Sequence, residues 1–237
     1  MRALEQHANF RVRLAVEHWL AARHLAPDKR ELVRSRSVDS VEAALLDLDL
    51  LCRRAPTLER LNLLGSAYKR LALLEVDASK QLEALVNMAQ HYHLSLARQN
   101  NAYAYTNWLA ATLLALQRGA TLAVDAKQVQ HQISEHQREL NQHLAEDPNF
   151  WDAASLADLS LSSLLLRGAG KTRARPKLSA GEAAAPVVAA YRAAIGRSSS
   201  PREQASLTEN LDFLILLWSA HDKTTVHILE QLRESLT

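Results

Sequence analysis

The chain has 237 residues, 48% of them hydrophobic and 23% charged, which is the balance of a globular protein with a substantial buried core. Its 28 Lys and Arg residues against 26 Asp and Glu give a net charge of +2, and this excludes a strong general attraction to nucleic acid or anionic membranes. The single cysteine, Cys52, excludes an internal disulfide, and no apolar run reaches the roughly 18 residues that a membrane span needs. Because the N-terminus also lacks the apolar core of a secretory signal, we expect a cytoplasmic protein.

Helical patterns begin at the first residues. The composition, with only six Gly, six Pro and 5% aromatic residues, favours helix over sheet. The first predicted helix covers about 3–25 and stops at Pro27. Its apolar side consists of Leu4, Val12, Val16, Trp19 and Leu20. Asp39 and Glu42 then have the spacing of an N-cap and capping box, which predicts a new helix over 41–54.

The stretch 57–119 holds three amphipathic patterns, joined by links of a few residues that make neighbouring helices antiparallel. They cover 58–74, 79–98 and 101–119. Gly65 lies in the middle of the first helix, where glycine costs about 1 kcal/mol relative to alanine. We therefore expect a second helix to approach closely at this position. Gly119 ends the group and fits a left-handed position after a helix.

A polar helix is predicted over 125–146, with a narrow apolar stripe that places it on the outside of the fold. The stripe consists of Val129, Ile133, Leu140 and Leu144. Asp147 and Pro148 have the pattern of an N-cap and first helical residue, and that helix ends at Gly168. The helical pattern then breaks until about residue 180, which predicts a long loop.

Two further helices follow the loop, and a last one covers about 224–236. Pro186 lies inside the first of them and predicts a kink or the true first turn. Ser200, Pro201 and Glu203 combine a cap, a first-turn proline and a capping box, the strongest helix start in the chain.

The residues Leu64, Gly65 and Tyr68 resemble the first helix of a tetratricopeptide repeat, where a large, a small and an aromatic residue follow at these offsets. The segments 91–97 and 190–196 resemble its second helix. The succession LLGSAYKRLA, NFWDAASLADLSL and SPREQASLTENLDFL is similar to helical regions of bacterial proteins whose repeats accompany caspase-like (CHAT) peptidases or other effector domains in defence systems. This resemblance covers most of 57–218.

The fold that follows is all-α: an irregular tetratricopeptide-like helical-repeat array, or α-solenoid, of about nine or ten helices. We expect N-terminal helices over 1–56 that pack on the array and a central repeat core over 57–168. A basic flexible loop over 169–180 and C-terminal helices over 181–237 complete the predicted organisation.

The resemblance implies a scaffold or sensor domain for protein–protein interaction, as part of a bacterial defence or signalling assembly with a caspase-like peptidase or other effector. A cysteine peptidase needs a cysteine beside a histidine base, but Cys52 lies in a leucine-rich helix next to Arg53 and Arg54. We therefore expect no catalytic residues, no cofactor and no enzymatic activity in this chain. The expected partner is another protein, rather than a membrane, a nucleic acid or a small molecule.

Polar side chains at helical steps predict where that partner binds. In a helix-pair repeat the first helix of each pair lines the concave surface. The predicted groove residues are Asn62, Ser66, Lys69, Arg70, Tyr103 and Asn107. A structural alternative exists for single members, in which Asn107 is a hydrogen-bonded core asparagine and Lys69 is merely exposed.

Histidines offer a metal site as an alternative, and an enzyme built on the polar helix is the third hypothesis. His136, Glu139 and His143 share one face of that helix, but a ligand from another element is missing. A polar exposed face without metal is the prediction.

The loop after Gly168 contains GAGKT, which is similar to the end of a phosphate-binding loop. The earlier glycine of that motif would fall at Leu165, inside a helix, and no strand precedes it, so the motif fails. A cluster of basic residues remains, Arg167, Lys171, Arg173, Arg175 and Lys177. The favoured interpretation is a solvated linker. The alternative function is a helical nucleic-acid-associated regulator that uses loop 167–177, with Lys171, Arg173 and Arg175 as anion contacts.

Overall fold

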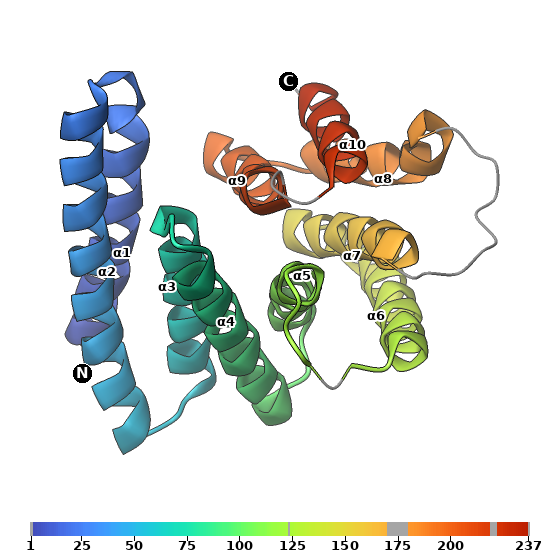
Figure 1. Ribbon diagram of the computed structural model, residues 1–237. Coiled ribbons are helices and arrows are strands. Elements are labelled where there is room, and N and C mark those ends of the chain that lie inside the picture. Colours follow the sequence, from blue (N-terminus) through green and yellow to red (C-terminus); the bar gives the residue numbers. More distant parts are fainter. Residues whose placement is uncertain (1, 123, 170–179, 219–221, 237) are drawn as a thin grey trace. The chain divides into compact units, whose positions relative to one another are not determined.

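The computed structural model describes residues 2–122, 124–169, 180–218 and 222–236, and these form ten α-helices and one 3-10 helix, with no strand among them (Figure 1). In chain order they are α1 (Arg2–Ala21), η1 (Ala22–His24), α2 (Pro27–Arg54), α3 (Leu58–Leu74), α4 (Ala78–Arg98), α5 (Ala102–Gln117), α6 (Ala126–Glu146), α7 (Phe150–Ala169), α8 (Ala180–Ile195), α9 (Pro201–Trp218) and α10 (Lys223–Glu234). The predicted all-α helical array is confirmed. None of the helices in these ranges combines the length and hydropathy needed to cross a membrane.

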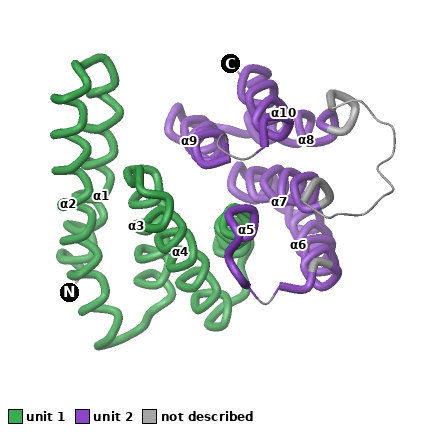
Figure 2. The backbone as a smooth tube through the Cα atoms, viewed as in Figure 1, with its two compact units in different colours: residues 1–115 green, residues 116–237 purple. Residues whose placement is uncertain are grey.

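The chain divides into two compact units, residues 1–115 and 116–237 (Figure 2). The boundary falls near the end of α5, inside the range 57–168 that the sequence predicts as a central core. The four-part division drawn from the sequence stays a prediction. Each unit is described by itself below.

Unit 1 is built from antiparallel helix pairs. Helices α1 and α2 pack side by side, as do α3 and α4, and α3 also packs against both α1 and α2 (Figure 1). Small and branched apolar side chains from these first three helices interlock in one core. That core contains Ala8, Val12, Ala15, Val16, Val41, Ala44, Leu45, Leu48, Cys52, Leu61, Leu64, Ala67 and Leu74. Its formation from successive helix pairs is the packing that a helical repeat requires.

The first two helices differ from their predicted form. Helix α1 ends at Ala21 and a 3-10 turn follows, and two predicted core residues, Leu4 and Leu20, are exposed. Helix α2 is continuous from Pro27, so the predicted start at Asp39 is wrong. Packing overrides the local capping signal, because Ser37 is buried in the middle of the helix and donates a hydrogen bond to the Ala15 carbonyl of α1 at 2.8 Å.

A buried ion pair joins the starts of α1 and α3. The guanidinium Nε of Arg60 lies 2.6 Å from a carboxylate oxygen of Glu5, and both side chains are almost fully buried. The same guanidinium donates to the carbonyls of Leu51 and Ala55, at 3.0 and 2.7 Å. Arg60 thereby adds a side-chain donor to two carbonyls at the end of α2 that also accept from backbone amides, Leu51 from Ala55 and Ala55 from Thr57.

Caps fix the ends of α3 and α4. The side chain of Thr57 accepts from the Arg60 amide at the start of α3, and Asp77 accepts from the amides of Ser79 and Lys80 at the start of α4. Gln81 then reaches back and donates to carbonyls in the last turn of α3. These bonds set the length and direction of the link between the two helices.

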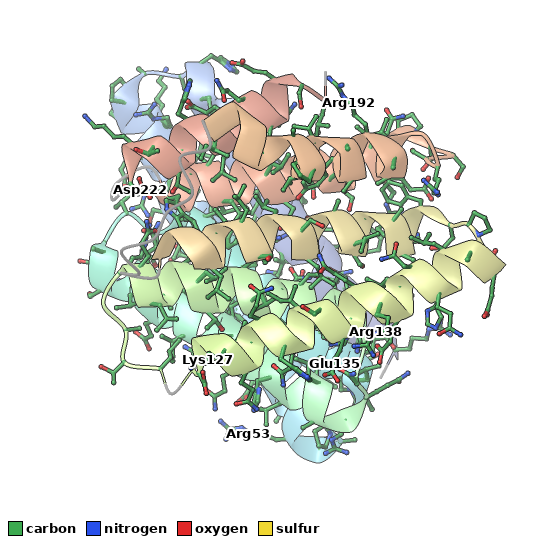
Figure 3. The ribbon with its side chains drawn as sticks, turned by 90° about the vertical axis from the view of Figure 1, so that its right-hand side faces the viewer. Arg53, Lys127, Glu135, Arg138, Arg192 and Asp222 are labelled. Atoms are coloured by element: carbon green, nitrogen blue, oxygen red, sulfur yellow. The ribbon has the colours of Figure 1, made fainter. Side chains whose placement is uncertain are left out.

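Unit 2 contains helices α6 to α10, in which α7 packs against α6 and α8, and α10 against α8 and α9. Three members of the predicted apolar stripe of α6 are buried, Val129, Ile133 and Leu140, and the fourth, Leu144, is half-buried. Figure 3 shows α6 lengthwise, with Lys127 and Arg138 among the charged side chains along it.

A polar junction ties three helices of unit 2 together. The hydroxyl of Tyr191 in α8 donates to Asp158 of α7 at 2.6 Å, and the amide of Asn210 in α9 donates to the same oxygen at 3.0 Å. Tyr191 is fully buried, so this bond satisfies a hydroxyl that water does not reach.

Helix starts in unit 2 follow the sequence signals in part. Helix α9 begins at Pro201, with Ser200 accepting from the Glu203 amide, as predicted. Helix α7 begins at Phe150 rather than at Pro148, and the side chain of Asn149 accepts from the Asp152 amide, so the predicted cap at Asp147 is wrong.

The backbone positions of Gly119 and Pro186 test two further predictions. Gly119 has the predicted left-handed conformation, with φ of 87°. Pro186 lies inside α8, which begins at Ala180, so it does not mark the first turn.

Candidate functional site

The centre of the α3–α4 pair is a close contact between Gly65 and Tyr92. A β-carbon at position 65 would lie 2.7–2.9 Å from three atoms of the Tyr92 ring, closer than real carbon contacts allow. Tyr92 is fully buried, so a methyl group at position 65 would force a side chain inside the fold to shift. The close approach predicted from Gly65 is therefore confirmed, and it brings the Tyr92 hydroxyl to one end of the contact.

Polar groups gather at that hydroxyl. The Tyr92 and Tyr103 hydroxyl oxygens are 3.4 Å apart, and the two rings meet edge to face with centroids 6.0 Å apart. Burial raises the pKa of Tyr92 well above its ordinary value, Tyr103 raises it further, and Arg70 and a hydrogen bond with Ser66 lower it in part. The structure thus brings three predicted groove residues, one from α5 and two from α3, to one buried phenol.

Arg70 is held by its own helix. One of its terminal nitrogens donates to the carbonyl of Ser66 at 3.1 Å and to the Ser66 hydroxyl at 2.5 Å. The side chain is half-buried, and within the described part of the chain no carboxylate pairs with it. A guanidinium has five N–H donors in a rigid fork, so Arg70 keeps donors for an acceptor from outside.

Asn62 extends this polar surface by one helical turn. Its side-chain oxygen accepts from the Ser95 hydroxyl of α4 at 2.7 Å, which orients the amide and leaves its N–H groups as donors. We call the residues Asn62, Ser66, Arg70, Tyr92, Ser95 and Tyr103 the Tyr92 cluster. Sequence reasoning missed Ser95 and the role of Tyr92, although Gly65 signalled that a bulky side chain lies opposite.

The other two predicted groove residues lie beside this cluster. Asn107 donates to the Tyr103 carbonyl of its own helix at 2.9 Å and is partly exposed, so it is not a core asparagine. Lys69 is half-buried rather than freely exposed.

Aromatic rings of α3, α4 and α5 make two further groups of contacts in unit 1. Tyr68 and His91 stack with centroids 5.4 Å apart and planes 10° from parallel, and Trp108 packs near both His93 and Tyr105. The Nδ1 atom of His91 is buried without a hydrogen-bond partner in the described residues. Burial lowers the pKa of His91, and the nearby charge of Asp49 opposes that change only in part.

The thiol of Cys52 lies away from this chemistry. It is a buried member of the unit 1 core, and burial, assisted by Asp49, raises its pKa. A thiol with a raised pKa is mostly protonated at neutral pH and is a poor nucleophile.

The three candidate metal ligands of α6 do not converge. His136 is buried, with Nδ1 3.5 Å from Glu139, so the prediction that all three residues form an exposed face is wrong for His136. His143 is exposed, and its Nδ1 lies 3.9 Å from Asp152 of α7. Across the described ranges, no three His, Cys, Asp or Glu side chains gather closely enough to hold a metal ion.

The predicted basic loop lies outside the described residues. Helix α7 continues to Ala169 and α8 begins at Ala180, so the segment holding Lys171, Arg173 and Arg175 falls between two described ranges. Anion or nucleic-acid contact by these three residues stays a prediction.

One family matches part of the chain. The model of the family described as "Tetratricopeptide Repeats-Sensor" matches residues 2–114, nearly half of the sequence. The matched range coincides with unit 1 except for one residue at each end. No curated protein matches the chain, and no solved structure does. Residues 2–114 are therefore a tetratricopeptide-like region, which confirms the resemblance found at Leu64, Gly65 and Tyr68. The match overlaps the predicted range 57–218 over 57–114 and also includes the N-terminal helices, which were predicted to pack on the array.

Proposed function

We propose that unit 1 is a protein-recognition module of the sensor or scaffold type, and that the accessible members of the Tyr92 cluster, Asn62, Ser66, Arg70 and Tyr103, are part of its contact surface. The observation that carries this proposal is Arg70. Its guanidinium is oriented by Ser66, is half-buried, and has no carboxylate partner in the described residues. A positioned charge that the fold itself does not neutralise is suited to an acceptor on another molecule.

The chemistry of the cluster defines what it would bind. Arg70 and Asn62 present N–H donors, and Tyr103, at 49% exposure, presents a rigid ring edged by a hydroxyl. Carboxylate and backbone carbonyl oxygens of a protein segment complement such donors, and tyrosine contributes contact area at low entropic cost. The buried bonds behind the surface hold the donors in place before binding, which lowers the entropy lost on association.

The biological setting belongs to the same proposal. The family name describes a sensor, and the sequence resembles repeats that accompany caspase-like peptidases and other effectors. We assign this chain the sensing or scaffolding role in a bacterial defence or signalling assembly, and no catalysis. The effector activity would come from the partner, since the thiol of Cys52 is buried and has a raised pKa.

Affinity capture from the native host tests the assignment. The full chain, the Arg70→Ala variant and an Arg54→Ala control would be immobilised, and the recovered proteins identified by mass spectrometry. Arg54 is exposed at the end of α2, so its removal should leave the recovered partner unchanged. Removal of Arg70 should reduce recovery about tenfold or more, the effect of losing a central interface residue.

Two outcomes would contradict the proposal. Equal recovery by the Arg70→Ala variant, with unchanged circular dichroism, would show that the surface lies elsewhere. Recovery of nucleic acid that is lost when Lys171, Arg173 and Arg175 are neutralised would support the alternative regulator instead.

A further inference from the structure

We propose that the outer face of α1 is a dimerisation surface on which a second copy of this chain docks, with the two α1 helices antiparallel. This inference is independent of the partner surface at the Tyr92 cluster. It rests on the side of α1 that points away from the core of unit 1.

A stripe of exposed residues runs along the whole of α1. Its members recur at alternating steps of four and three, which is the spacing of the seam between two helices of a coiled coil. The stripe consists of Ala3, His7, Phe10, Leu14, Glu17 and Ala21, all of them exposed. The core residues Ala8, Val12 and Ala15 lie on the opposite side of the same helix. Helix α1 therefore has two faces built for helix packing, and unit 1 uses only one.

The two largest side chains of the stripe are conspicuously exposed. Phe10 is 69% exposed and Leu14 is 51% exposed, one helical turn apart at the centre of the stripe. Burying a phenylalanine and a leucine from each copy would remove the largest apolar area of this helix from water, which favours association.

The stripe is complementary to itself when it is reversed. Rotation about an axis through the middle of α1, at position 12, places position 3 opposite 21, 7 opposite 17, and 10 opposite 14 of the partner. Phe10 then meets Leu14 of the partner subunit, and Leu14 meets the partner's Phe10. The imidazole of His7 meets the carboxylate of the partner's Glu17, and Glu17 meets the partner's His7. Small alanines at both ends allow the helices to approach closely. A two-fold interface requires this self-complementarity, and it is why we assign a second copy as the occupant.

A second exposed apolar pair lies on a helix face that is not complementary to itself when it is reversed. Leu46 and Leu50 of α2 are 73% and 57% exposed, one turn apart. Reversal about their midpoint sets Ala43 against Arg53, and Arg53 already pairs with Asp49 at 2.7 Å. This pair therefore provides a matched control for the α1 stripe.

The expected dimer is weak. The stripe is about 27 Å long at 1.5 Å per residue. A single helix pair lies at the small end of specific interfaces, so we expect a dissociation constant on the order of micromolar. Arg13, at the edge of the stripe, comes near its own copy in this register, and the repulsion between like charges also limits affinity.

Sedimentation analysis of the full chain over a range of concentrations tests the proposal. The parent should change from monomer to dimer with concentration, and the double variant Phe10→Ala with Leu14→Ala should dissociate at least tenfold more readily. Its circular dichroism and melting temperature in dilute solution should match the parent, because both side chains are exposed in the monomer. The Leu46→Ala, Leu50→Ala variant should dimerise like the parent. A parent that stays monomeric, or a dimer that survives loss of Phe10 and Leu14, would overturn the proposal.

Charge exchange tests the antiparallel register. The variant His7→Glu sets a carboxylate opposite Glu17 of the partner subunit and should weaken the dimer severalfold. Adding Glu17→Lys to the same chain restores opposite charges at both contacts and should recover the parent's affinity. If the second change weakens the dimer further, positions 7 and 17 do not meet and the register is wrong.

Discussion

The ion pair between Glu5 and Arg60 connects residues far apart in the sequence, and both side chains are nearly inaccessible to water. Loss of one partner leaves the other charge buried without full compensation. We therefore expect Glu5→Ala to lower the free energy of unfolding by about 3 kcal/mol or more. Chemical denaturation measures this loss. The Glu42→Ala control removes an exposed carboxylate and should change stability by less than about 0.5 kcal/mol. Equal effects of the two changes would mean that the buried pair does not stabilise unit 1.

His91 gives the fold a pH dependence with a definite sign. Burial lowers its pKa from the ordinary value of 6.5, so the unfolded chain binds a proton at a higher pH than the folded chain does. The free energy of unfolding therefore carries no penalty from His91 above pH 6.5, and it decreases as the pH falls below that value.

We expect His91→Phe to flatten this dependence, because phenylalanine keeps the stacking on Tyr68 and has no proton to bind. The measurement is the free energy of unfolding between pH 7.5 and about 5.5, the range in which histidine titrates. Adding His136→Phe should flatten it further, since burial also lowers the pKa of His136. Identical pH slopes in parent and His91→Phe would contradict the assignment.

At the scale of the helices, Gly65 determines how closely α3 and α4 pack. Alanine is the better helix former by about 1 kcal/mol, which would favour Gly65→Ala in an isolated helix. Its methyl group would, however, overlap the buried Tyr92 ring, and overpacking of this kind costs roughly 1–3 kcal/mol. Because Tyr92 is fully buried, we expect the upper end of that range and a net loss of stability.

Thermal unfolding of the Gly65→Ala variant tests this balance. Gly196→Ala is the control, because its new methyl group would find its nearest neighbour at 3.5 Å, an ordinary contact. Combining Gly65→Ala with Tyr92→Leu should cost less than the sum of the two single changes, since the smaller side chain relieves the overlap. A stabilised Gly65→Ala variant would show that α3 and α4 are not in such close contact.

Local chemistry predicted many helix ends but not all. The signals at Ser200 and Gly119 decide the backbone by themselves, through a capping box and a left-handed turn. The signal at Asp39 does not, because α2 buries Ser37 and Val41 against α1 only if the helix continues through it. A capping box indicates where a helix can start, and tertiary packing determines whether a helix starts at that residue.

The side chains that share a face were predictable within one helix and not across helices. Asn62, Ser66 and Lys69 follow from steps of four and three within α3, and Arg70 lies beside them, as helical geometry fixes. Ser95 and Tyr92 lie opposite them only because of the register between α3 and α4, and sequence periodicity does not contain that register. The exposed stripe on α1 was not predicted for a related reason. The apolar pattern of a helix identifies the face that packs against the core, and it does not show whether the opposite face is covered.

For the whole molecule, the family match and the physical division of the chain agree. Residues 2–114 match the sensor tetratricopeptide family, and the compact unit that contains them ends at residue 115. Unit 2, with α6 to α10, has its own polar junction at Asp158 and its own capped helices. Recognition by unit 1 and a role in a defence assembly both stay part of the proposal.

Hydrogen–deuterium exchange of the full chain, with and without the partner recovered from the host, tests recognition by unit 1 most directly. Binding should slow exchange in peptides from 58–74, 78–98 and 102–117, which carry the Tyr92 cluster and its neighbours. The Arg70→Ala variant should lose this protection at the same partner concentration. Protection confined to α6–α10, or unchanged protection in the variant, would mean that unit 1 does not bind the partner through this surface.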